Sequence, residues 1–346
     1  MQKKEMGNKK VLLTGVTGFV GSHTAIQLLN KGYEVIGTLR SNDRINSIKE
    51  TISKHTANID NLAFSEADLN DSNVWFELTK NVDYVQHIAS PFPRALPKHE
   101  NDLIIPAKAG TLNVLKAAAS NNVKRVVMTS SLAAVVYGKT KSEFNSVFTE
   151  SDWSDETKKK DTTPYIRSKT IAEKAAWDFI KHNNSGLELV TVCPGAILGT
   201  VLEKDFGTSA NIIITLLDGS LPALPKIEFD IVDVRSVADL LIRAMEIPQA
   251  AGNRYIASSG HLTFKGVAQI LKQHYPDRKI PTSELPNFIA RLFSIFQPLL
   301  KPVLIERVER KTEISKAKNE LKWQPLSPQE AVIACAESII ENGLVK

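Results

Sequence analysis

A phenol and an ammonium group lie four residues apart in the segment "PYIRSK", which contains Tyr165 and Lys169. In a helix, positions i and i+4 share one face, so the two side chains would project side by side. A phenol placed there can donate a proton to an oxygen atom that gains negative charge. We expect the neighbouring cation to favour the phenolate and to lower the pKa of Tyr165. Taken alone, the pair is more simply a tyrosine ring stacked on a lysine stem, so other features must decide.

The residues around this pair predict a helix. Thr162, Thr163 and Pro164 resemble a helix start, with a hydroxyl N-cap followed by proline at the first helical position. The stretch "YIRSKTIAEKAAWDFIKH" that follows has strong helix formers and apolar residues at helical spacing. We therefore predict a helix over 165–182.

Near the amino terminus, three glycines follow the first predicted strand. The segment "TGVTGFVGS" places Gly15, Gly18 and Gly21 at three-residue intervals before the first predicted helix. Glycines at such positions allow a tight turn, close backbone approach to a ligand and close packing of helix on strand. The free N–H groups and positive dipole end of the helix then suit a pyrophosphate. An ordinary strand-to-helix turn is the alternative, but such a turn rarely needs all three glycines.

Two arginines follow the second predicted strand, in the segment "GTLRSNDR". A cofactor with a free ribose 2′-hydroxyl usually meets an acidic residue at this place. Arg40 and Arg44 instead offer guanidinium groups, which match a 2′-phosphate through charge-assisted hydrogen bonds. This pattern favours NADP(H). The alternative is that both arginines are solvated and Asp43 contacts the ribose.

Short apolar runs alternate with helical patterns along the first two thirds of the chain. We predict strands over 10–15, 34–40, 62–68, 82–90, 124–131, 187–195 and 253–258. We predict helices over 19–31, 71–80, 101–121, 165–182 and 234–246. Such alternation implies a Rossmann-type, doubly wound parallel sheet with helices on both faces.

The alternation breaks down near 194, which suggests a smaller, mostly helical C-terminal lobe that binds substrate. We expect a nucleotide-binding Rossmann domain over 9–193, to which 226–258 return. The substrate lobe would then comprise 194–225 and 259–346.

Composition limits the classes of function. The 346 residues are 42% hydrophobic and 23% charged, and the net charge is +5. The first ten residues carry four lysines and one glutamate, so the remainder is nearly balanced and gives no case for nucleic-acid binding. The two cysteines, Cys193 and Cys335, suit buried thiols in a reducing compartment, and we expect a cytoplasmic protein. The Cys and His residues show no metal-ligand spacing, so no metal is expected.

The longest apolar stretch, over 288–305, is interrupted by Arg291, Pro298, Lys301 and Pro302. A membrane span needs a longer uninterrupted apolar run. We predict a pair of helices that cover a core or an interface, with weak association with a membrane surface as the alternative.

These features together resemble the extended short-chain dehydrogenase/reductase superfamily. The branch with dihydroflavonol reductases, cinnamoyl-CoA reductases and yeast-type methylglyoxal or aldehyde reductases is the most similar. The resemblance spans residues 11 to about 260. It is carried by "VLLTGVTGFVGSHTAIQLLNKGYEVIGTLR", "ADLND", "VDYVQHIASPFP", "ENDLIIPAKAGTLNVLKAA", "KRVVMTSSLAAVVYG", "PYIRSKTIAEKAAWDF", "VCPGAILG" and "NRYIASSG".

The resemblance implies a catalytic triad of Ser131, Tyr165 and Lys169, with Ser130 as the alternative serine. Tyr165 would be the general acid, Lys169 would tune it and contact the nicotinamide ribose, and Ser131 would hold the carbonyl oxygen. Further contacts to NADP(H) are implied for residues that follow the predicted strands. They are Gly15, Thr17, Gly18, Phe19, Val20, Gly21, Arg40, Arg44, Asp68, Leu69, Ile88, Ala89, Ser90, Pro194, Gly195, Ala196, Ile197 and Ser209. Asn113 is expected to tie its helix to a neighbouring strand.

The function implied is an NADPH-dependent reduction of an aldehyde or ketone by an oxidoreductase, acting on a small molecule as a monomer or homodimer. A nucleotide-sugar epimerase or dehydratase shares the triad, and a non-catalytic NADP-binding regulator shares the fold. Phe92, Leu132, Tyr137 and Phe206 suggest an apolar substrate pocket.

Overall fold

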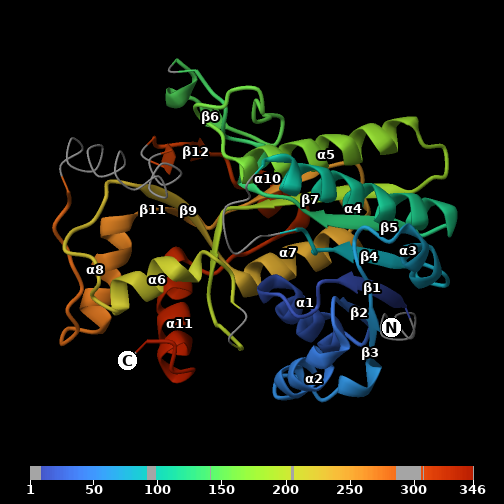
Figure 1. Cartoon of the computed structure of the whole chain (residues 1–346), viewed down its shortest axis with the longest axis horizontal. Helices are drawn as coiled ribbons and strands as arrows, with labels where there is room; N and C mark the ends of the chain where they lie inside the picture. The colour runs from blue at the N-terminus through green and yellow to red at the C-terminus, as the bar shows by residue number, and fades with distance from the viewer. Residues whose placement is uncertain are drawn as a thin grey trace.

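The computed structural model describes residues 9–91, 99–140, 142–203, 206–285, 305–306 and 308–345. Its centre is a parallel sheet of seven strands in the order β10-β7-β5-β4-β1-β2-β3 (Figure 1). These strands are β1 (Lys10–Thr14), β2 (Glu34–Leu39), β3 (Leu62–Glu66), β4 (Tyr84–His87), β5 (Arg125–Thr129), β7 (Glu188–Pro194) and β10 (Arg254–Ala257). The strand order reverses direction between β1 and β4, which is where ligands bind in open α/β sheets.

Helices cover both faces of this sheet (Figure 1). One layer contains α3 (Ser72–Leu78), α4 (Asn101–Ser120) and α5 (Pro164–His182). The other contains α1 (Phe19–Asn30) and α7 (Val234–Glu246), which pack against each other. The strands between the layers are rich in buried aliphatic residues, as expected for a sheet covered on both faces. The doubly wound Rossmann fold predicted from the sequence is confirmed.

Local sequence explains where α5 begins. The Thr163 side chain accepts a hydrogen bond from the backbone N–H of Ile166 at 3.2 Å, and Pro164 occupies the first turn. Proline fits there because its missing N–H is not needed by the helix. The helix therefore starts one residue before the predicted Tyr165, and its bound at His182 agrees with the prediction.

A smaller lobe lies beside the carboxyl ends of the main sheet (Figure 1). Its three-stranded sheet, in the order β11-β9-β8, contains β8 (Ala196–Leu198), β9 (Glu228–Asp233) and β11 (Gly260–Thr263). The helices in this part are α6 (Ala210–Leu217), α8 (Phe264–His274) and α11 (Pro328–Glu341). Ser327 caps α11 in a capping box with Glu330. The short strands β6 (Val147–Phe148) and β12 (Lys311–Thr312) pair with each other, and α10 (Ser315–Leu321) packs against β10.

Two features differ from the simple alternation seen in the sequence. Residues 45–53 form an amphipathic helix, α2 (Ile45–Ser53), that the sequence analysis did not assign. Within 226–258, β9 pairs with β8 and β11 in the smaller sheet, whereas α7 and β10 join the main sheet and its helices.

The apolar stretch at 288–305 lies outside the described residues except at Ile305. Among the helices that the structure describes, no apolar run is long enough to span a bilayer.

Candidate active site

The glycine loop between β1 and α1 is built on close backbone contacts. Gly15 has a φ of +74°, which L-residues with a side chain rarely adopt. A Cβ atom on Gly21 would lie 2.0 Å from the carbonyl oxygen of Gly15, so only glycine fits there. One on Gly15 would approach the Cβ atom of Ala89 at 3.1 Å, beyond the end of β4. These two glycines therefore serve the packing of helix on strand.

Gly18 has a different environment. A Cβ atom there would meet only the carbonyl oxygen of Gly15, at 3.4 Å, among the atoms of the described residues. Gly18 is the N-cap of α1, and no side chain of the described part of the chain caps this helix. The first N–H groups of α1 are thus presented beside open space at the positive end of the helix dipole. Phe19 and Val20 belong to this turn, and Thr17 precedes it. The arrangement fits the pyrophosphate of a dinucleotide.

The loops after β1 and β4 are joined by one hydroxyl group. Thr14 Oγ1 accepts hydrogen bonds from the backbone N–H groups of Ile88 at 3.0 Å and of Ala89 at 2.9 Å. The same oxygen lies 3.1 Å from His87 Nδ1. The half-buried segment from Ile88 to Ser90 is therefore held against the glycine loop at the reversal of strand order.

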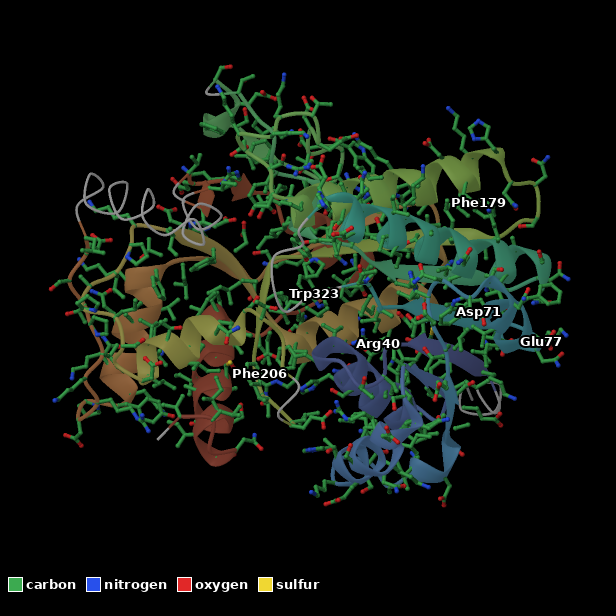
Figure 2. The ribbon with its side chains drawn as sticks, in the orientation of Figure 1. Arg40, Asp71, Glu77, Phe179, Phe206 and Trp323 are labelled. Atoms are coloured by element: carbon green, nitrogen blue, oxygen red, sulfur yellow. The ribbon has the colours of Figure 1, made fainter. Side chains whose placement is uncertain are left out.

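The two arginines after β2 have different surroundings. Arg40, which is labelled in Figure 2, is exposed. Among the described residues it has no ion-pair or hydrogen-bond partner. The Arg44 guanidinium donates to Glu203 Oε1 at 2.8 Å, which joins this edge to the loop after β8. The carboxylate of Asp43 accepts a hydrogen bond from Ser41 Oγ at 3.0 Å. Arg40 is therefore available for an anionic ligand as far as the described residues are concerned, whereas Arg44 would have to share such a ligand with Glu203.

Asp68 and Leu69 follow β3 at the same edge of the sheet. The exposed carboxylate of Asp68 accepts a hydrogen bond from the backbone N–H of Asn70 at 2.7 Å. The N-cap of α3 is Asp71, so Asp68 does not cap that helix. Asn113 Nδ2 donates to the carbonyl oxygen of Leu69 at 2.9 Å, which ties α4 to the loop after β3.

The structure brings Ser131, Tyr165 and Lys169 to one place. Ser131 follows β5 in extended conformation, and its hydroxyl group forms a hydrogen bond with the phenol of Tyr165. Lys169 lies one turn further along α5 and is buried. Burial lowers the pKa of Lys169 to about 8, and the nearby charge of Glu173 opposes this effect.

The lowered pKa expected for Tyr165 is wrong. Burial raises the pKa of Tyr165 above its usual value, and the hydrogen bond with Ser131 only partly offsets the rise. The cost of placing a phenolate in a buried site therefore exceeds any help from its neighbours. The phenol retains its proton at neutral pH.

The adjacent Ser130 is not available for the same contact. Its side chain is buried and donates a hydrogen bond to Glu173 Oε2 at 2.5 Å. The sequence analysis missed Glu173, although Tyr165, Lys169 and Glu173 follow one another at four-residue spacing. This spacing was the available signal, because it places all three on one face of α5.

The segment from Pro194 to Ile197 links the two sheets. Pro194 ends β7, and Ala196 and Ile197 begin β8. A Cβ atom on Gly195 would lie 2.3 Å from the carbonyl oxygen of Asp230, so the close approach of β9 requires glycine.

The loop after β8 returns to the glycine loop. His23 Nε2 lies 2.8 Å from the carbonyl oxygen of Thr200, and a Cβ atom on Gly207 would approach Phe19 at 3.0 Å. The half-buried Ser209 follows and is the N-cap of α6. This part of the smaller lobe therefore lies over the start of α1.

The residues expected to form an apolar pocket lie in separate clusters. Leu132 is buried, and Tyr137 packs against the same cluster. The Tyr137 hydroxyl group donates to Glu306 Oε1 at 2.9 Å. Phe206 packs against the main core near α6 (Figure 2). Phe92 lies outside the described residues.

The family profile described as the NAD dependent epimerase/dehydratase family matches residues 11–257. This match covers the main sheet except Lys10, together with its flanking helices, and extends over β8 and β9.

Curated relatives match most of the chain. A cinnamoyl-CoA reductase of Medicago truncatula is 34% identical over 287 residues, which are 81% of this chain and 85% of the relative. A ketoreductase of Aspergillus niger is 33% identical over 299 residues, which are 81% of this chain and 87% of the relative. Among solved structures, the yeast methylglyoxal/isovaleraldehyde reductase complexed with NADPH has a TM-score of 0.81 and 26% identity. That likeness covers 96% of this chain and 98% of the yeast chain.

Proposed function

Because the chain belongs to the NAD dependent epimerase/dehydratase family, we propose that it is an NADPH-dependent carbonyl reductase, which converts an aldehyde or ketone to an alcohol. The observation that carries this proposal is the hydrogen bond between Ser131 and the protonated phenol of Tyr165, beside the buried Lys169. Reductases of carbonyl compounds among the relatives support the same reaction class.

Each of the three side chains has a distinct role. Tyr165 is the general acid, which donates its phenolic proton to the carbonyl oxygen as that oxygen gains negative charge. The Ser131 hydroxyl group donates a hydrogen bond to the same oxygen and stabilises the developing alkoxide. Lys169 stabilises the tyrosinate left after proton transfer, because a nearby cation favours the charged form of a phenol. NADPH supplies the hydride.

The cofactor would be held by the carboxyl ends of the main sheet. The uncapped start of α1 and Gly18 would receive the pyrophosphate, and Arg40 would contact the 2′-phosphate. Asp68, Leu69 and the segment from Ile88 to Ser90 would line the adenosine side. The segment from Pro194 to Ile197 and Ser209 would lie on the nicotinamide side. The yeast structure, which contains NADPH, supports this choice of cofactor.

Substrates of this proposed enzyme are small apolar aldehydes or ketones. We infer this class from the aldehydes named for the yeast reductase. A nucleotide sugar would need a charged diphosphate site in addition to the cofactor site.

The deciding experiment measures NADPH oxidation by the purified protein with isovaleraldehyde, methylglyoxal and a wider carbonyl panel. Nucleotide sugars are assayed in parallel for epimerisation and for protection from thermal unfolding. We expect turnover with at least one carbonyl compound, loss of turnover in Tyr165→Phe, and nearly unchanged NADPH binding in that variant. Epimerisation of a nucleotide sugar with tightly bound NAD, and no carbonyl turnover, would contradict the proposal.

A further inference from the structure

Glu173 is a fully buried carboxylate one helical turn beyond Lys169. Its oxygens accept hydrogen bonds from Ser130 Oγ at 2.5 Å and from Thr191 Oγ1 at 2.7 Å. Arg254 Nε donates to the same carboxylate at 2.8 Å, and Trp177 Nε1 donates at 3.3 Å. All four groups donate to Glu173, and Arg254 and Trp177 can only donate, so the site favours an acceptor with no proton of its own.

Arg254, the direct ion-pair partner of Glu173, is also buried. Its Nη1 donates to the carbonyl oxygens of Glu150 at 2.7 Å and Asp152 at 2.6 Å, and its guanidinium group lies 3.7 Å from the centroid of the Trp153 ring. Carbonyl groups and an aromatic ring satisfy the donors but carry no net charge. The charge of Arg254 is therefore balanced by Glu173, because an uncompensated buried charge is costly.

Three other titratable groups around Lys169 are neutral, namely His87, Cys193 and Tyr165. Burial, followed by the positive charge of Lys169, lowers the pKa of His87 on β4 to about 3, so this ring is uncharged at neutral pH. Burial raises the pKa of the Cys193 thiol on β7, and burial raises that of the Tyr165 phenol on α5. Glu173 is thus the negative charge that acts on Lys169 within the described residues.

Two further ionisable groups, Arg254 and Glu150, lie near Glu173. Arg254 on β10 lies near this site because it forms an ion pair with Glu173. Glu150 accepts a hydrogen bond from the backbone N–H of Ile256 at 3.1 Å, and burial raises the pKa of its carboxyl group. If Glu173 lost its charge, Lys169 and Arg254 would be two buried cations without a shared counter-ion.

We propose that Glu173 is a positioning residue of the active site, whose carboxylate keeps Lys169 protonated and anchors Ser130 so that Ser131 faces Tyr165. The geometry supports both roles of Glu173. The i to i+4 spacing places the carboxylate on the Lys169 face of α5. Side chains of consecutive residues in extended backbone point in opposite directions, so fixing Ser130 toward Glu173 directs Ser131 away from it. The consequence for turnover rests on the function proposed above.

The competing explanation is a buried ion pair that only stabilises the fold. Both explanations predict that loss of Glu173 lowers stability, since one member of a buried pair would be left alone. They differ in the proton affinity of Lys169, which changes only if Glu173 acts on that residue. The test therefore measures the titration of Lys169 directly.

The first measurement is the ¹³Cε chemical shift of Lys169 as a function of pH. The protein is labelled with ¹³C-lysine and contains no carbonyl compound. The resonance is identified by its absence in Lys169→Met. In the wild type we expect a midpoint near pH 8, from the pKa of about 8 that burial gives Lys169. In Glu173→Gln we expect a midpoint lower by about one to three pH units, the size of effect that one nearby charge produces.

Thr191→Val is the matched control. It removes one hydrogen bond to the Glu173 carboxylate at 2.7 Å but leaves its charge in place. Its Lys169 midpoint should stay within about 0.3 pH units of the wild-type value, because the charge that acts on Lys169 is unchanged. If Glu173→Gln behaves like Thr191→Val, the proposal is overturned. If Glu173→Gln does not fold, the double variant Glu173→Gln/Arg254→Met, which removes both buried charges, takes its place. Its Lys169 midpoint should still lie below the wild-type value, but by less than in Glu173→Gln, because loss of the Arg254 cation opposes the shift; an unmoved midpoint would overturn the proposal.

The second measurement is the pH profile of isovaleraldehyde reduction. Wild-type turnover should fall as pH rises past about 8, where Lys169 loses its proton. The fall should begin at lower pH in Glu173→Gln, whereas Glu173→Asp should restore most of the wild-type profile. A uniform loss of kcat with an unmoved midpoint would overturn the proposal. If the wild type reduces no carbonyl compound, the proposed function fails, and the Lys169 titration still decides the role of Glu173.

Discussion

The Ser131 hydroxyl group forms a hydrogen bond with the phenol of Tyr165, although 34 residues separate the two in the chain. The preceding serine, Ser130, instead donates to Glu173. Two adjacent residues of the same type therefore have different partners on one helix, and their substitutions should have different consequences.

Replacing Ser131 by alanine should reduce kcat for carbonyl reduction by about 10²–10³, the usual cost of removing one donor to a developing oxyanion. Ser131 Oγ also accepts a hydrogen bond from the backbone N–H of Ala133 at 3.1 Å. The same turn is held by the backbone hydrogen bond from Ala134 N–H to the Ser131 carbonyl oxygen at 2.9 Å, so thermal stability should change little. Ser130→Ala should instead lower the free energy of unfolding by about 1–3 kcal/mol, since it leaves a buried acceptor with one donor fewer. Steady-state kinetics and urea unfolding of both variants separate the effects. A larger kcat loss in Ser130→Ala would contradict the assignment of Ser131.

Alanine substitutions of two glycines in the same loop should have different effects, one on stability and the other on NADPH binding. Gly21→Ala places a Cβ atom 2.0 Å from the Gly15 carbonyl oxygen, so the backbone must move, at a cost of about 1–3 kcal/mol or more. Gly18→Ala meets only one atom, at 3.4 Å, and its φ of −81° suits alanine. We expect Gly18→Ala to be within about 1 kcal/mol of wild-type stability. Its methyl group would, however, occupy the space proposed for the pyrophosphate and weaken NADPH binding.

Urea unfolding and fluorescence titration with NADPH check this pair of glycine variants. Wild-type affinity in Gly18→Ala would rule out the proposed position of the pyrophosphate. Wild-type stability in Gly21→Ala would rule out the packing role of Gly21.

Arg40 should decide the choice between NADPH and NADH. The exposed guanidinium is available to pair with a 2′-phosphate. Replacing it by aspartate should weaken NADPH binding by about 1.5–3 kcal/mol, which is about tenfold to a hundredfold. NADH has no 2′-phosphate, so its binding should be preserved or improved. Isothermal titration with both cofactors measures the change, and equal losses for NADPH and NADH would show that Arg40 acts elsewhere.

His23 should make the protein sensitive to acid. Burial lowers the pKa of His23 to about 4 from an ordinary value of 6.5, so the folded state holds it neutral. Between those values the unfolded chain binds the extra proton. The stability contributed by neutral His23 is therefore present above about pH 6.5 and is lost as pH falls toward 4, amounting to about 3 kcal/mol.

The control for this acid effect is His23→Gln, which keeps a hydrogen-bond donor near the carbonyl oxygen of Thr200 but cannot titrate. Urea unfolding at several pH values between 4 and 7 should show a slope smaller by about one proton in the variant. Equal slopes in the two proteins would contradict the neutral, buried state of His23.

The sequence by itself determined those features that depend on neighbouring residues. Helical periodicity with a threonine cap and a proline predicted α5. Tyr165 and Lys169 are four residues apart in that helix, so they were expected to share one face. The glycine loop was predicted in the same way, because a strand, a tight turn and a helix start need only about ten consecutive residues. Alternation of strands and helices predicted the parallel sheet, since a crossover helix leaves few other arrangements.

Tertiary structure decided the features that join distant parts of the chain. The choice between Ser131 and Ser130 depended on where α5 lies against the end of β5, which no local pattern reveals. Glu173 and Arg254 are 81 residues apart, and their pairing needed β10 to lie beside β7. The direction of the Tyr165 pKa shift also depended on packing, because burial raised the pKa and the hydrogen bond with Ser131 offset only part of the rise. Spacing along a chain specifies which groups share a helix face, whereas solvent exclusion and charge balance arise only when distant elements pack together.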